Sequence, residues 1–353
     1  MQQLNTVFLV VVGTYLIHAD NHAERITMGA LIASVILSGR ALAPLAQIAG
    51  LATRFQQAKL ALKGVNDIVT RPIERNPERK YITLDNVQGN ITFENVSFKY
   101  QADNNSAVED LRLTIKPGEK VGILGRIGSG KSTMLKLASG LYDTEKGNVT
   151  LDGVDMRQLD PNFLRDQVLL LSQSPRLFLG TLRENMDLAR TVSYSTDQDL
   201  LIALNRFGLD KIIRNHPRGL DMPLGEDGLG LSGGQKQIIA LARMTLRNPK
   251  VVLLDEPTTS LDQATERMAL NAIAQWGRNR TMLLVTHRPQ VLQIVNRIIV
   301  MDNGKVVMDG PRDLVLQKLM QNEQAKAANV KQQQQAVNAK QQQQAAAPQS
   351  AAQ

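Results

Sequence analysis

The chain has 353 residues, of which 43% are hydrophobic, so it is long enough to bury the core of one large or two ordinary domains. It contains no cysteine, which excludes a disulfide framework, a thiolate metal site and a cysteine nucleophile. The formal net charge is +8, yet only 4% of the residues are aromatic, so little surface is available for stacking on bases and we predict no nucleic-acid partner. Basic residues instead gather between Arg54 and Lys80, where they suit the flank of a membrane segment and a linker.

Two apolar segments near the N-terminus predict membrane helices at about residues 4–18 and 28–52. The first could instead be a signal peptide, but no basic residue precedes it, and the polar sequence His18-Ala19-Asp20 follows where small residues would mark a cleavage site. The second is long enough to cross a bilayer, and its many Gly, Ala and Ser residues suit close packing between helices. We therefore predict that residues 1–70 form a partial transmembrane domain; a pair of buried helices in a soluble protein is the alternative.

The basic residues predict the orientation of this segment in a membrane. Arg54, Lys59 and Lys63 follow the second apolar segment, and the positive-inside rule places such residues on the cytoplasmic side. The rest of the chain would then be cytoplasmic, and the polar turn at residues 18–27 would lie on the opposite side of the membrane.

The fold class of the remaining chain is predicted to be α/β. Residues 71–90 are charged and interrupted by prolines, which predicts a linker, and a domain at residues 91–320 follows. Apolar and polar residues alternate at 91–100 and 111–115, which predicts half-buried antiparallel strands. Continuous apolar runs separated by helix-like segments predict a parallel sheet covered on both faces, with strands at residues 121–124, 168–171, 251–254 and 282–285.

Two further signals concern the C-terminal part. Asn303-Gly304 lies between two apolar runs, which predicts a β-hairpin. Residues 321–353 are rich in Gln and Ala and show no apolar periodicity, so we predict a disordered tail.

A glycine-rich loop directly follows the predicted strand at residues 121–124. Its sequence, GRIGSGKS, precedes a helix-like stretch and so has the pattern of a phosphate-binding loop in its required context. The glycines let backbone N–H groups converge on phosphates, Lys131 can reach the terminal phosphates, and Ser132 can bind Mg²⁺. The candidate nucleotide-binding residues here are Gly125, Arg126, Ile127, Gly128, Ser129, Gly130, Lys131, Ser132 and Thr133.

Polar residues also follow the other predicted parallel strands, and in open α/β sheets ligands bind beyond these carboxyl ends. Asp255 could hold Mg²⁺, Glu256 could polarise an attacking water, and His287 could contact the terminal phosphate. Each has a structural alternative, because an isolated histidine is often structural and an acidic pair often caps a helix. Their occurrence at one sheet edge nevertheless predicts a catalytic site. The candidate catalytic residues are Lys131, Gln173, Glu256 and His287, and the candidate Mg²⁺ ligands are Ser132, Gln173 and Asp255.

A second glycine-rich sequence, Leu231-Ser232-Gly233-Gly234-Gln235, opens another helix-like stretch and predicts a second anion-binding site. One nucleotide already has the first loop, so a neighbouring copy of the chain would present the second loop to close a shared site. The alternative is a capped glycine turn that binds no ligand.

The sequences GRIGSGKS, LSGGQ, VVLLDEP and Thr286-His287, in this order and spacing, resemble the nucleotide-binding domain of ABC transporters over residues 91–320. The resemblance implies an ATPase that uses ATP and Mg²⁺ and works as a homodimer. A soluble ABC ATPase acting on ribosomes or DNA repair complexes is an alternative from another class.

The resemblance also implies roles for individual residues. Tyr100 would stack on adenine, and Gln173 would couple the site to the membrane domain. Ser232 and Gly234 would contact the ATP of the partner subunit, and Asp262 matches the loop through which the subunits communicate.

Membrane helices N-terminal to the ATPase match the exporters of this family. Residues 28–62 and the sequence SQSPRLFLGTLREN resemble type I secretion ATPases, especially those that export large RTX-type adhesins. This implies an inner-membrane protein with a cytoplasmic ATPase domain, a secreted protein substrate, a periplasmic adaptor protein and an outer-membrane channel. Such exporters bring about six membrane helices per subunit and this chain about two, so it resembles their C-terminal part. A truncated ATPase without autonomous transport and a lipid, drug or peptide exporter are the alternatives.

Overall fold

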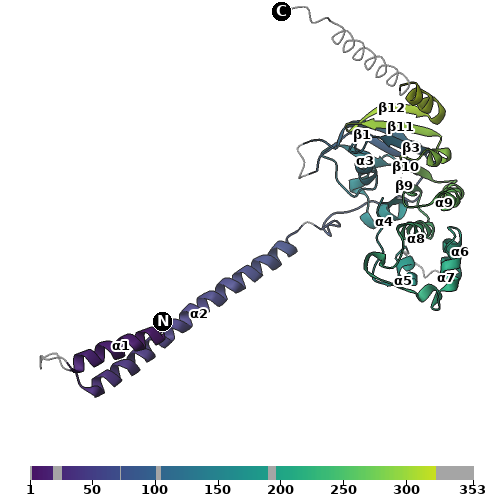
Figure 1. The fold of residues 1–353 in the computed structure, drawn as a ribbon. Coiled ribbons are helices and arrows are strands. Elements are labelled where there is room, and N and C mark those ends of the chain that lie inside the picture. The colour runs from purple at the N-terminus through teal and green to yellow at the C-terminus, as the bar shows by residue number, and fades with distance from the viewer. Residues whose placement is uncertain (1, 19–25, 72, 101–104, 190–195, 323–353) are drawn as a thin grey trace, which may run out of the picture. The chain divides into compact units, whose positions relative to one another are not determined.

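The computed structural model describes residues 2–18, 26–71, 73–100, 105–189 and 196–322, and almost all of the predicted tail at 321–353 lies outside these ranges (Figure 1). The chain divides into two compact units, Met1–Asn76 and a second unit that begins at Pro77.

The first unit is a helical hairpin of α1 (Gln2–Ile17) and α2 (Met28–Val69), which lie side by side (Figure 1). Helix α1 agrees with the predicted segment at 4–18 to within two residues. A Cβ atom at Gly13 would lie 2.1 Å from Leu31 Cδ1, so the absence of a side chain allows the helices to approach. Asn5 also donates a hydrogen bond across the pair to Ser38.

Helix α2 is longer than predicted, because it continues to Val69 although the apolar segment ends near residue 52. Residues 53–69 are mostly good helix formers such as Ala, Leu, Lys and Gln, so nothing in them stops the helix when its surface becomes polar. Its 42 residues correspond to about 63 Å at 1.5 Å per residue, roughly twice the hydrocarbon thickness of a bilayer. Only the apolar part is therefore available to cross a membrane.

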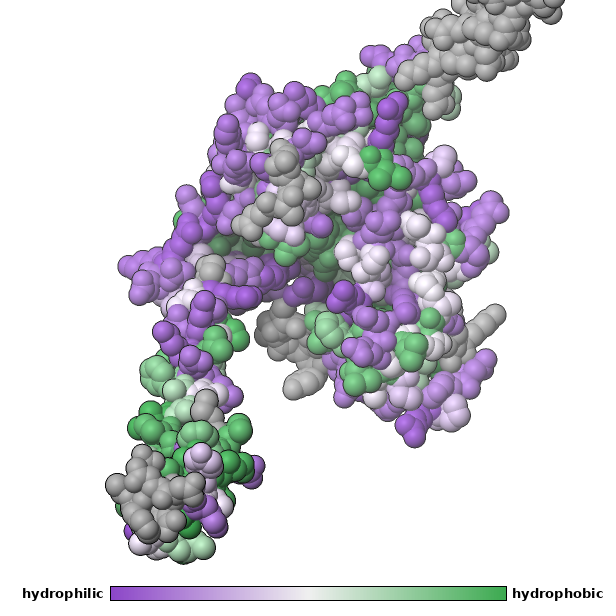
Figure 2. Space-filling model, turned by 60° about the vertical axis from the view of Figure 1, so that its left-hand side comes forward, coloured by the Kyte–Doolittle hydropathy of each residue, from purple (hydrophilic) through white to green (hydrophobic). Residues whose placement is uncertain are grey.

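The hairpin exposes its apolar side chains. Helix α2 contains an 18-residue window with a mean hydropathy of 1.6, and none of that window is buried by the residues that the structure describes. Leu37, Leu45 and Leu51 are each at least 60% exposed, and Figure 2 shows apolar residues over much of the hairpin surface. Buried helices of a soluble core would have these side chains covered, so the described part of the chain does not support that alternative.

The second unit has the predicted α/β fold. A sheet of six strands has the order β12-β11-β3-β10-β9-β6, a sheet of four has the order β2-β1-β4-β5, and β7 pairs with β8. The strands are β1 (Ile91–Phe98), β2 (Val108–Ile115), β3 (Lys120–Gly125), β4 (Lys146–Leu151), β5 (Val154–Asp155), β6 (Val168–Leu171), β7 (Gly180–Thr181), β8 (Pro223–Leu224), β9 (Val251–Asp255), β10 (Thr281–Val285), β11 (Arg297–Asp302) and β12 (Lys305–Pro311).

Helices pack on the six-stranded sheet, and several of them gather in a separate cluster beside it (Figure 1). They are α3 (Lys131–Ala138), α4 (Pro161–Gln167), α5 (Leu182–Asp187), α6 (Asp197–Asn205), α7 (Asp210–Asn215), α8 (Gly233–Thr245) and α9 (Gln263–Trp276). The predicted antiparallel pair is β1 with β2, and all four predicted parallel strands are present as β3, β6, β9 and β10.

Both faces of the six-stranded sheet are buried, in two separate apolar cores. Along β9, Val251 and Leu253 face the core shared with the four-stranded sheet, whereas Val252 and Leu254 face the core shared with α8 and α9. This alternation follows from the two-residue period of a strand. It explains why these strands are continuous apolar runs in the sequence.

Residues of the predicted linker at 71–90 are partly tied to the second unit. The carboxylate of Asp152, in the turn between β4 and β5, accepts hydrogen bonds from the backbone N–H groups of Gln88, Gly89 and Asn90. Ile82 pairs with Leu159 in an isolated parallel bridge. The end of the linker is therefore held by the fold, which its charged and proline-containing sequence does not reveal.

The predicted hairpin joins β11 to β12. Asn303 and Gly304 have φ angles of 47° and 78°, the pair of positive values that a two-residue hairpin turn of this kind requires. The N–H of Gly304 donates to the carbonyl of Ser129 at 3.2 Å, so this turn also supports the glycine-rich loop.

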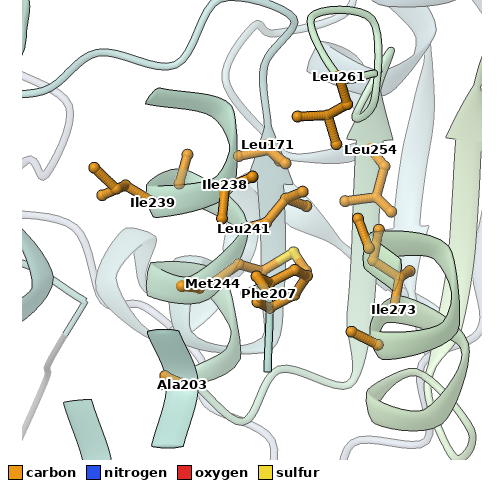
Figure 3. Close-up of a cluster of buried hydrophobic side chains, with 14 of the residues drawn as sticks. Leu171, Ala203, Phe207, Ile238, Ile239, Leu241, Met244, Leu254, Leu261 and Ile273 are labelled. Carbon is orange, nitrogen blue, oxygen red and sulfur yellow. The ribbon is translucent and has the colours of Figure 1, made fainter. Parts of the chain in front are cut away.

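We expect Phe207→Ala to lower the free energy of unfolding of the second unit by about 3–5 kcal/mol, because it empties a large buried site. Phe207 is 1% exposed and lies beside Met244 in the core between α8 and α9 (Figure 3). Leu201→Ala on α6 is the control, since Leu201 is 42% exposed and should cost less than about 1 kcal/mol. Urea unfolding followed by fluorescence of Trp276, the single tryptophan, measures both, and equal costs would contradict the assignment of this core.

Candidate functional site

Parallel pairing brings the predicted site residues to one edge of the sheet. Strands β3 and β9 each pair in parallel with β10, and β6 pairs in parallel with β9. Their carboxyl ends therefore meet, and Val285 at the end of β10 is the registered partner of Asp255 at the end of β9. The glycine-rich loop, the acidic pair and His287 all begin at this edge, as predicted.

The glycine-rich loop leads from β3 into the N-terminus of α3. Gly128 and Gly130 have φ angles of 81° and 93°, and a Cβ atom at Gly130 would lie 2.3 Å from the carbonyl oxygen of Ala107. No described side chain caps α3, so its first N–H groups have no intrahelical acceptor. Free N–H groups at a helix N-terminus after such a turn form a binding site for an anion.

Lys131 is the first residue of α3 and is 7% exposed. Its Nζ donates to the carbonyl oxygens of Gly125 and Arg126 at 2.8 and 2.7 Å. Burial lowers the pKa of Lys131, and the nearby carboxylates of Glu256 and Asp255 partly oppose this change. The ammonium group lies inside the loop, so a bound phosphate would compete with these carbonyls for its hydrogens.

A cavity of about 480 Å³ opens beside the loop and is lined by Tyr100, residues 105–107 and residues 128–133. The hydroxyl of Tyr100 lies 3.1 Å from Thr133 Oγ1, and its ring packs edge-on against Phe98 with 4.9 Å between the centroids. The cavity is of the size that small-molecule ligands occupy, and it has an aromatic ring on one side and phosphate-binding N–H groups on the other.

Ser132 and Asp255 come together although they are far apart in the sequence. Burial raises the pKa of the Asp255 carboxyl group, while a hydrogen bond from Ser132 and the charges of Lys136 and Lys131 lower it. Among the described residues, Asp255 Oδ1 is buried and has no hydrogen-bond partner. A hydroxyl beside a buried carboxylate with a free oxygen is a donor set that suits Mg²⁺.

Glu256 has an unusual backbone conformation, with a φ of 49°. For a residue with a long side chain this costs about 1–3 kcal/mol and persists only where the surroundings enforce it. Glu256 Oε1 is buried without a hydrogen-bond partner among the described residues, and it lies 3.7 Å from Nε2 of the half-exposed His287. A water bound to one side of this pair could hydrogen-bond to both groups, which is the arrangement expected for a water-polarising carboxylate.

Three residues that contact this region were not predicted from the sequence: Gln237, Glu266 and Arg288. Gln237 and Glu266 are 1% and 4% exposed, on the buried faces of α8 and α9. Polar residues at apolar helical positions are a possible signal, but the sequence does not say which partner satisfies them.

The second glycine-rich sequence forms the N-terminus of α8, as predicted. Ser232 caps this helix and is exposed, accepting from the N–H of Gln235 at 3.2 Å, while Gln235 Oε1 accepts from the N–H of Ser232 at 2.8 Å. Gly233 and Gly234 begin the helix, and a Cβ atom at Gly234 would lie 3.0 Å from the carbonyl oxygen of Ser260. The helix cap that the alternative of a ligand-free glycine turn requires is thus present. The helix N-terminus also faces solvent, where a ligand can reach it.

Two other predicted residues lie at element ends. Asp262 caps α9, accepting from the N–H groups of Ala264 and Thr265 at 3.0 and 3.1 Å. A hydrogen bond from the hydroxyl of Thr265, together with these backbone bonds, holds the pKa of Asp262 below the usual range. Gln173 lies two residues beyond β6 and is exposed, at the strand end next to β9. Their functional roles stay predictions.

Residues 108–259 match the family model of the ABC transporter. The chain carries an ABC transporter domain. Its second unit is therefore an ABC ATPase domain with ATP and Mg²⁺ as cofactors, and the residues described above fit both groups. The loop N–H groups and Lys131 would hold phosphates, and Ser132 with Asp255 would hold the cation.

Relatives of this ABC protein act in toxin export. It is 36% identical to the alpha-hemolysin translocation ATP-binding protein HlyB of Escherichia coli O157:H7, over 83% of this chain and 41% of that protein. It is 35% identical to the leukotoxin export ATP-binding protein LtxB of Aggregatibacter actinomycetemcomitans, over 82% of this chain and 41% of that protein. The chain thus spans about two fifths of the length of these relatives.

A solved structure supports the exporter type of this ABC domain. The structure of a bacterial Atm1-family ABC exporter with ATP bound matches with a TM-score of 0.70 and 25% identity, over 88% of this chain and 54% of that chain. The match extends beyond the ATPase unit, since 88% of the chain is more than that unit contains.

We expect Lys131→Ala to weaken ATP binding by about 10- to 100-fold, because it removes charge-assisted hydrogen bonds to phosphate. Equilibrium titration with a fluorescent ATP analogue measures the Kd. Lys116→Ala removes an exposed lysine after β2 and should leave the Kd unchanged. An unaltered affinity in Lys131→Ala would contradict the phosphate-loop assignment.

We expect Glu256→Gln to lower kcat for ATP hydrolysis by about 10²- to 10⁴-fold, because the amide cannot polarise the attacking water. The Kd for ATP should change by less than about twofold, because the side chain keeps its size and its buried position. Phosphate release and nucleotide titration on the same preparation separate the two quantities. Near-normal hydrolysis by this variant would show that another group activates the water.

Proposed function

We propose that the chain is the ATP-hydrolysing part of an exporter that moves a protein across the inner membrane by type I secretion. The observation that carries the proposal is the combination, in one chain, of two glycine-rich loops at helix N-termini, the buried pair Asp255 and Glu256, and an exposed apolar hairpin. The export functions named for its relatives HlyB and LtxB support a protein substrate.

Within this proposal each site residue has a role. Glu256 polarises the attacking water, and His287, 3.7 Å from its carboxylate, contacts the terminal phosphate. Tyr100 stacks on adenine beside Thr133. Gln173, exposed at the end of β6, couples the site to the membrane helices and completes the Mg²⁺ environment.

We further propose that two copies form a homodimer. Both kinds of phosphate-contacting loop occur in one chain, so a symmetric pair closes two equal sites without a different partner. Ser232 and the N-terminus of α8 are exposed, which leaves them accessible to the nucleotide of a second copy. Asp262 at the N-terminus of α9 would then lie at the junction between the copies.

The proposal also specifies location and partners. The apolar part of α2 spans the inner membrane and the ATPase domain is cytoplasmic, consistent with the basic residues between Arg54 and Lys80. Secretion across two membranes requires a periplasmic adaptor protein and an outer-membrane channel as further partners.

A secretion assay tests the function. A strain whose gene is disrupted is complemented with the wild-type gene or with Glu256→Gln, and the proteins in the culture medium are compared by mass spectrometry. We expect at least one protein to fall by more than about tenfold with Glu256→Gln, because binding without turnover cannot drive repeated export. Identical extracellular proteins in both strains, with normal ATPase activity of the wild type, would favour a lipid, drug or peptide substrate.

A further inference from the structure

A short segment, residues 256–262, leads from the end of β9 to the start of α9 and carries Glu256 at its first position. Glu256 has a positive φ that its side chain disfavours, so neighbouring groups must hold the segment in place. Two sets of side-chain hydrogen bonds hold the segment, one from α8 and one from the residues that follow β10.

The first set comes from α8. Gln237 is 1% exposed, and its Nε2 donates to the carbonyl oxygen of Glu256 at 3.0 Å. Gln237 lies two residues after Gln235, in the helix that Ser232 caps. The backbone of the water-polarising residue is thereby joined directly to the helix whose N-terminus carries the second glycine-rich loop.

The second set comes from Arg288, the residue after His287. Its Nη2 donates to the carbonyl oxygen of Thr259 at 2.9 Å, and its Nη1 donates to that of Leu261 at 3.3 Å. Its Nη1 also donates to Glu266 Oε1 at 2.8 Å. The guanidinium group thus binds two backbone carbonyls of the segment and one carboxylate of α9.

The carboxylate of Glu266 connects Arg288 to the segment a second time. It is 4% exposed, and its Oε1 accepts from Thr258 Oγ1 at 2.7 Å in addition to Arg288. The next residue of the segment, Thr259, places its hydroxyl 3.2 Å from both the carbonyl oxygen and Oε2 of Glu256. Arg288 and Glu266 therefore hold Thr259 and Thr258 by hydrogen bonds, and the hydroxyl of Thr259 in turn contacts the carboxylate of Glu256.

We propose that Gln237, and Arg288 paired with Glu266, are positioning residues that hold Glu256 in its strained conformation, with its carboxylate aimed at the attacking water. The inference rests on the proposed role of Glu256 in hydrolysis. It adds that Gln237 and Arg288 act on the catalytic carboxylate through hydrogen bonds to the backbone of residues 256–262. The guanidinium of Arg288 reaches its three acceptors through two nitrogens held in one plane, a geometry that the single ammonium nitrogen of a lysine does not reproduce.

The test uses Arg288→Lys and Gln237→Leu in the purified full chain in lipid nanodiscs. We expect each to lower kcat by about 10- to 100-fold, the effect of a misplaced catalytic group, with the Kd for ATP changed by less than about twofold. Arg267→Lys is the matched control, because Arg267 lies on α9 next to Glu266 and is exposed. Its kcat should equal that of the wild type.

A second measurement separates positioning from general stabilisation. Each substitution is repeated in the Glu256→Gln background, where a positioning residue has nothing left to position and the low remaining turnover should not fall further. A further fall there, loss of ATP binding, or a kcat of Arg288→Lys within twofold of the wild type would overturn the inference. Absence of ATP hydrolysis by the wild type would instead refute the proposed function itself.

Discussion

The parallel register of β3, β10, β9 and β6 is the constraint on which the rest of the ATPase unit depends. Both faces of this sheet are buried, so a shift of one residue in any strand would turn its inward side chains to the opposite core. The register is therefore enforced by packing that has no part in the chemistry. Because the carboxyl ends of parallel strands lie at the same edge, the register also fixes the positions of the glycine-rich loop, the acidic pair and His287.

The site buries charged groups, which costs free energy when no ligand is bound. Lys131 and Asp255 are buried, their pKa values are shifted toward the neutral forms, and oxygens of Asp255 and Glu256 lack hydrogen-bond partners among the described residues. Bound Mg²⁺ and nucleotide would satisfy these groups. The fold thus maintains a site whose polar groups are completed by ligand, which favours binding of the nucleotide over an empty site.

Different physical demands shape the two units. The ATPase unit covers its apolar residues with two cores, whereas the hairpin leaves the apolar residues of α2 exposed. The hairpin therefore needs an apolar environment outside the described residues, which the proposed membrane location supplies. The hydrogen bonds from Gln88, Gly89 and Asn90 to Asp152 fasten the end of the predicted linker to the four-stranded sheet of the ATPase unit.

Sequence alone determined the fold class, the four parallel strands and the residues of the phosphate loop, because each depends on local signals: continuous apolar runs, turn glycines, and a lysine at a helix start. It also placed Asp255, Glu256 and His287 at one edge of the sheet, since strand ends are visible in the sequence. The prediction ended α2 near residue 52, where the apolar segment ends, but the helix continues to Val69. An apolar segment shows which residues can lie in a membrane, whereas the helix continues for as long as its residues favour helix. Only the tertiary structure revealed the positive φ of Glu256 and the hydrogen bonds from Gln237, Arg288 and Glu266. Gln237 and Arg288 contact a segment that lies 19 or more residues away from them in the sequence. The type of a polar residue does not reveal which distant backbone group it will bind.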